Sequence, residues 1–100
     1  MNIVNVNFLI NIIRMSMSSD KKTKQLYDSI IYQQKIDIFT EIDLITPTLA
    51  INDIQKLHNI LLEYTNKHSC VNNPDYNYEL FNKLELTNQR IYELENRTFS

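Results

Sequence analysis

The side chains best suited to metal binding or nucleophilic chemistry are His58, His68 and Cys70, the only histidines and the only cysteine of this chain. A structural zinc site normally has four ligands, usually in close pairs, and this chain has no fourth histidine or cysteine. A carboxylate such as that of Asp75 would have to complete the set. We therefore predict no metal site. His68 is expected to end a helix, where a cation suits the helix dipole, and Cys70 to pack as a small apolar side chain.

Three acids, Asp37, Glu41 and Asp43, stand in an isoleucine-rich stretch. In a helix, Asp37 and Glu41 would share one face, and paired carboxylates can exchange protons or bind a divalent cation. A solvated helix face is the more common origin of such spacing, and we predict that here.

The chain of 100 residues contains no glycine. Glycine lets a backbone approach a phosphate closely and is required by the P-loop, the dinucleotide-binding loop and the nucleophile elbow. A cysteine nucleophile paired with a histidine would also need an oxyanion hole, and nothing in the sequence indicates one. We therefore expect a protein that is not an enzyme and that has no catalytic residues and no cofactor.

The composition is that of a globular domain, with 43% apolar and 22% charged residues and a formal net charge of −2. This charge does not favour a nucleic-acid partner. We interpret Lys21, Lys22 and Lys24 as the solvated first turns of a helix. The excess of Ile, Asn, Lys and Tyr is typical of an AT-rich genome, such as that of a large DNA virus, a protist or an AT-rich bacterium. The single cysteine favours a reducing compartment, and we expect the cytoplasm.

The first seventeen residues are predicted to be an apolar extension of a helical domain over 18–100. The extension has an apolar run too short to span a membrane. It is expected to pack on the body as a strand or a helix. It has two alternative interpretations: an interfacial membrane anchor over residues 3–13, or an upstream extension of a product that starts at Met15 or Met17. Membrane contact would use five side chains: Phe8, Leu9, Ile10, Ile12 and Ile13.

Apolar residues recur at spacings of four and three through the rest of the chain, which predicts three long helices. The first begins after Ser18-Ser19-Asp20 and ends before Pro47, although residues 35–45 also alternate as a strand would. The second covers 46–68, with Thr46 as its N-cap and Pro47 in its first turn. The third covers 74–97. Short connections favour antiparallel neighbours, so we predict an all-α antiparallel three-helix bundle or an extended helical hairpin with coiled-coil-like packing.

The apolar stripes are wide enough that three helices are not expected to cover one another completely. We therefore expect a protein that acts through protein–protein contacts, as a homo-oligomer or as a subunit of a larger assembly. The aromatic side chains Tyr78, Phe81 and Tyr92 lie beside the stripe of the third helix, where tyrosine suits an interface. The predicted protein interface consists of Leu80, Phe81, Leu84, Ile91, Tyr92 and Leu94.

Overall fold

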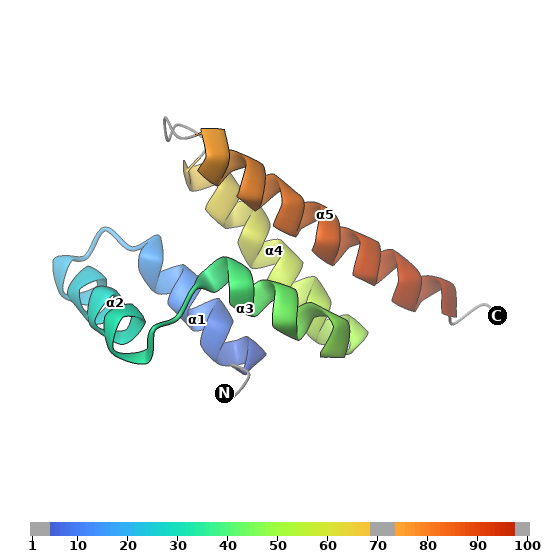
Figure 1. Cartoon of the computed structure of the whole chain (residues 1–100), viewed down its shortest axis with the longest axis horizontal. Helices are drawn as coiled ribbons and strands as arrows, with labels where there is room; N and C mark the ends of the chain where they lie inside the picture. The colour runs from blue at the N-terminus through green and yellow to red at the C-terminus, as the bar shows by residue number, and fades with distance from the viewer. Residues whose placement is uncertain (1–4, 69–73, 98–100) are drawn as a thin grey trace.

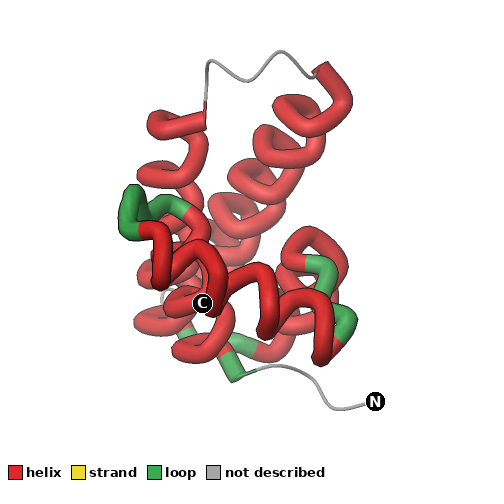
Figure 2. The backbone as a smooth tube through the Cα atoms, turned by 90° about the vertical axis from the view of Figure 1, so that its left-hand side faces the viewer, coloured by secondary structure: helices red, strands yellow, loops and turns green. Residues whose placement is uncertain are grey.

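The computed structural model describes residues 5–68 and 74–97, and this part of the chain is all-helical, without strands (Figures 1 and 2). Five α-helices and one short 3-10 turn pack against one another. The helices are α1 (Val6–Ser16), α2 (Lys21–Gln34), α3 (Ile38–Ile45), α4 (Ile51–His68) and α5 (Pro74–Arg97), and the turn η1 (Thr46–Thr48) lies between α3 and α4.

The two longest helices, α4 and α5, run antiparallel along each other and make the most extensive contact in the fold (Figure 1). The predicted periodicity explains this pairing, because the apolar residues that recur at spacings of four and three in α4 are buried. Ile54, Leu57 and Leu61 are all at most 1% exposed. On α5, Leu80 and Thr87 are buried in the same way. At about 25 cal/mol for each Å² of apolar surface, such burial is the main stabilising contribution.

The N-terminal segment forms helix α1, whose core-facing side chains are buried against α4 and the rest of the core. The Asn5 side chain caps the helix by accepting a hydrogen bond of 2.8 Å from the backbone N–H of Asn7. Leu9 and Ile13 are at most 1% exposed. The segment is therefore part of the same hydrophobic core as the later helices, and its strand-like alternation is not realised.

The helix expected to run from Asp20 to Ile45 is interrupted, and this is one reason why five helices stand where three were expected. Lys35 adopts the left-handed conformation (φ 52°, ψ 47°) and ends α2, with its N–H bonded to the carbonyl of Ile31. Asp37 then starts α3, because its carboxylate accepts hydrogen bonds from the Phe39 N–H and the Thr40 hydroxyl. Residues 38–45 are helical, so the strand alternative for this region is wrong.

The two expected helix starts around Asp20 and Thr46 have different outcomes. Asp20 caps α2 as predicted, accepting hydrogen bonds from the Thr23 N–H at 3.0 Å and the Thr23 hydroxyl at 2.8 Å. Thr46 does not cap the next helix. It is 1% exposed, and its hydroxyl donates a hydrogen bond of 2.6 Å to the Ile42 carbonyl. Pro47 belongs to η1, and α4 begins only at Ile51.

Candidate interaction surface

Of the histidines and the cysteine considered for metal or nucleophilic chemistry, the structure describes only the side chain of His58. The described residues contain no cluster of three or more His, Cys, Asp or Glu side chains that could hold a metal ion. His68 ends α4 in sequence, but its side chain, like Cys70 and the Asp75 side chain, lies outside the described part.

His58 instead connects α4 to α5. Its Nδ1 lies 2.8 Å from the Thr87 hydroxyl, and that hydroxyl is also 3.0 Å from the Lys83 carbonyl and 3.1 Å from the Leu84 carbonyl. The two carbonyls can only accept, so the Thr87 hydroxyl donates its proton to them. The hydroxyl oxygen then accepts a hydrogen bond from the Nδ1–H of His58. Partial burial lowers the pKa of His58, since it disfavours the charged imidazolium. In this arrangement His58 is a packing residue that links α4 to α5.

The three acids of the α3 region occupy different environments: Asp37 and Asp43 are exposed as expected, whereas Glu41 is buried, so the interpretation as a solvated face is wrong for Glu41. Asp37 caps α3. Glu41 is only 7% exposed, and its Oε2 has no hydrogen-bond partner among the described residues. Asp43 accepts a hydrogen bond of 2.6 Å from the Lys83 ammonium of α5. The periodic pattern missed this last contact because it joins residues forty positions apart in sequence.

The six residues of the predicted interface divide into three groups by exposure. Leu80 is 2% exposed and belongs to the intramolecular core, so it offers nothing to a partner in this fold. Leu84, Ile91 and Leu94 are partly buried and pack on the same core. Phe81 and Tyr92 are 57% and 65% exposed.

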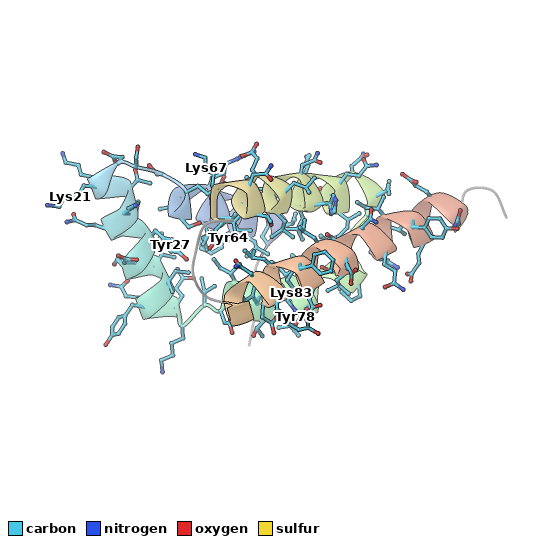
Figure 3. The ribbon with its side chains drawn as sticks, turned by 90° about the horizontal axis from the view of Figure 1, so that it is seen from above. Lys21, Tyr27, Tyr64, Lys67, Tyr78 and Lys83 are labelled. Carbon is cyan, nitrogen blue, oxygen red and sulfur yellow. The ribbon has the colours of Figure 1, made fainter. Side chains whose placement is uncertain are left out.

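Phe81 and Tyr92 share their face of α5 with Tyr78, which is also 65% exposed. With 3.6 residues in each helical turn, the three aromatic side chains lie within an arc of about 60° and extend over about 21 Å of the helix. We call Tyr78, Phe81 and Tyr92 the aromatic stripe. Figure 3 labels Tyr78.

The charges around the aromatic stripe are acidic, because both cations described on α5 are used within the fold. Lys83 bonds to Asp43 at 2.6 Å and lies 3.6 Å from Glu79, and its side chain is only 10% exposed. Arg90 donates to the Pro47 carbonyl at 3.0 Å and lies 3.7 Å from a Glu93 carboxylate oxygen. The exposed charged residues of the described part of α5 are therefore carboxylates: Glu85, Glu93 and Glu95.

A separate cleft of about 280 Å³ lies where α2 rests on the body of the fold, lined in part by Tyr27 of α2, Phe39 of α3 and Tyr64 of α4. Figure 3 shows Tyr27 and Tyr64 on neighbouring helices beside this position. The pKa of Tyr27 is raised, chiefly by burial and also by the negative charge that Tyr64 and Asp28 would place near its phenolate. Helical periodicity alone did not indicate this cleft, since it depends on the break at Lys35.

The side chains proposed for membrane contact are mostly inaccessible. Leu9, Ile10, Ile12 and Ile13 are at most 5% exposed, and Phe8 is half-buried. Among the described helices, none has both the length and the apolar character needed to cross a bilayer.

Comparison with known proteins gives no relative: no family model, no curated protein and no solved structure matches this chain.

Proposed function

We propose that this is a non-enzymatic protein that works through protein–protein contacts, as a homo-oligomer or as a subunit of a larger assembly, and that its docking surface is the outer face of α5. The observation that carries the proposal is the exposure of three aromatic side chains on one face, Tyr78, Phe81 and Tyr92, in a fold that buries most of its other large apolar residues. Tyrosine and phenylalanine are enriched in interfaces, where a few aromatic anchors provide most of the binding energy.

Two further features support the proposal. The aromatic stripe lies on a 24-residue helix that is fixed along its opposite face by Leu80 and Thr87, so the anchors are held on a rigid element. The acidic residues around it give the surface one sign of charge, which favours one orientation of a partner over others. Membrane attachment through residues 3–13 has no comparable support, since it would require α1 to leave the core.

The test compares two variants of the full chain. Phe81→Ala combined with Tyr92→Ala removes two anchors of the aromatic stripe, whereas Leu62→Ala removes an exposed apolar side chain of α4 that is 43% accessible. Self-association is measured by light scattering, and partner association by co-purification from the source cell, with circular dichroism as the check of folding. We expect the stripe variant to lose an association that the control retains. Equal association of both variants, or no association of the unmodified chain, would refute the proposal.

A further inference from the structure

Helix α2 stands apart from the other helices because none of its fourteen residues is buried. It packs chiefly on α1. Its outward side carries Lys21, Lys24 and Tyr32, which fall within an arc of about 80° of the helix. Tyr32 is 84% exposed, the highest value among the exposed large hydrophobic residues of the described chain. We call Lys21, Lys24 and Tyr32 the basic face of α2.

The charge of α2 is opposite to that of the aromatic stripe and its surroundings. Helix α2 holds three lysines, Lys21, Lys22 and Lys24, and one acid, Asp28. Asp28 lies on the same side of the helix as the basic face. Within the described part of the chain, Lys21 and Lys24 form no ion pair. Glu85, between Phe81 and Tyr92 on the outer face of α5, has no described cationic partner either. Each surface thus has charges that the other would complement.

The two surfaces are of similar length. The basic face covers about 17 Å of helix from Lys21 to Tyr32, and the aromatic stripe covers about 21 Å from Tyr78 to Tyr92. The basic face has one exposed aromatic side chain, Tyr32, beside two lysines and Asp28, and the aromatic stripe has three beside carboxylates. Two helices of this kind can pack side by side with Tyr32 against the aromatic stripe and with the charges of one helix near opposite charges of the other.

These surfaces cannot meet within one chain. α2 lies at one end of the long axis of the molecule, which measures 48 Å, whereas the C-terminal half of α5 projects at the other end (Figure 1). Figure 3 shows Lys21 at the end far from the C-terminal half of α5. Pairing of α5 with α5 of another copy would place Glu85 and its acidic neighbours against each other, so like charge disfavours that symmetric contact.

We propose that the occupant of the aromatic stripe is the basic face of α2 from a second copy of this chain. This inference rests on the function proposed above and names the partner. The contact joins two different surfaces, so a pair of copies joined by it keeps one free basic face and one free aromatic stripe. Such a contact adds further copies until it closes into a ring or continues as a filament, and it does not stop at a dimer unless two copies satisfy each other.

The experiment is a charge exchange in the full chain. One variant carries Lys21→Glu and Lys24→Glu, and the other carries Glu85→Lys and Asn88→Lys at exposed positions of α5. The matched control, Lys56→Glu with Lys67→Glu, makes the same charge change on exposed positions of α4. Particle mass is measured by light scattering against protein concentration, at about 0.02 M and about 0.5 M salt, because these differ strongly in screening.

We expect the unmodified chain and the control to associate in low salt and to dissociate in high salt. Each exchanged variant alone should associate about tenfold more weakly, and an equal mixture of the two should recover the original association, since every contact in it again joins opposite charges. A monomeric unmodified chain, or a mixture that fails to recover, overturns the inference. If Phe81→Ala with Tyr92→Ala abolishes association while the Lys21 and Lys24 exchange does not, the stripe binds something other than α2. In that case the proposed function stands and this inference fails.

Discussion

Replacement of Lys35 by glycine should stabilise the protein, although it removes a charged side chain and puts glycine into a chain that has none. Lys35 is the one described residue with positive φ. The left-handed conformation costs an L-residue roughly 1–2 kcal/mol, and glycine is nearly free of this cost. Glycine also makes the unfolded chain more flexible, which costs roughly 0.5–1 kcal/mol. The net expectation for Lys35→Gly is a gain of about 0.5–1 kcal/mol in the free energy of unfolding.

The matched control is Gln33→Gly, two residues earlier on an exposed position inside α2. Glycine there should cost about 1 kcal/mol, as in other helix interiors. The flexibility added to the unfolded chain is common to both variants, so it cancels in the comparison. Lys35→Ala, which keeps a β-carbon, separates the backbone effect from loss of the lysine charge.

Urea unfolding followed by circular dichroism measures all three variants, and a gain of 1 kcal/mol should raise the Tm by about 4–8 °C in a domain of this size. A loss of about 1 kcal/mol for Lys35→Gly, equal to that for Gln33→Gly, would refute the reasoning. That result would mean that one helix continues through residue 35, as the apolar periodicity by itself predicts.

Three further predictions concern the core. Burial lowers the folded-state pKa of His58 below its unfolded value, so the unfolded chain binds more protons between these two pKa values. The free energy of unfolding should therefore fall as the pH decreases below about 6.5 and level off below the folded-state pKa. Urea unfolding at several pH values measures this dependence, and His58→Gln should flatten it. Glu41→Met, which removes a buried acceptor that has no partner among the described residues, should raise the urea midpoint by the equivalent of about 1 kcal/mol, whereas a comparable loss would reveal a stabilising partner of Glu41. A chain that starts at Met15 loses Leu9 and Ile13, each worth about 2–5 kcal/mol, and should lack a cooperative thermal transition; a transition like that of the full chain would show that α1 is dispensable.

The sequence predicted the α4–α5 region well because its structure depends on local periodicity. The spacing of Ile54, Leu57 and Leu61 defines one face of a helix wherever that helix packs, and these three residues are buried as expected. The start of α2 at Asp20 was also predicted, since a cap involves only neighbouring residues.

The break at Lys35 and the burial of α1 were harder to predict because both depend on distant contacts. A left-handed residue is usually indicated by glycine or asparagine, and a lysine gives no such signal. The same periodicity that predicts a helix face does not reveal which neighbour covers it. For this reason Leu80 was placed at an interface although it belongs to the core, whereas the exposure of Phe81 and Tyr92 agrees with their positions beside the stripe.

The loose attachment of α2 has a consequence for how the protein opens. A helix without a buried side chain is held to the body by few core contacts, so it can separate at a lower free energy than global unfolding requires, while α1, α4 and α5 remain packed. In native-state hydrogen exchange, the α2 amides should therefore exchange by such local opening, much faster than the amides around Leu57 and Leu61, which require global unfolding. Docking of α2 on another copy would slow exchange in α2 alone, so assembly would be visible as protection of a single helix.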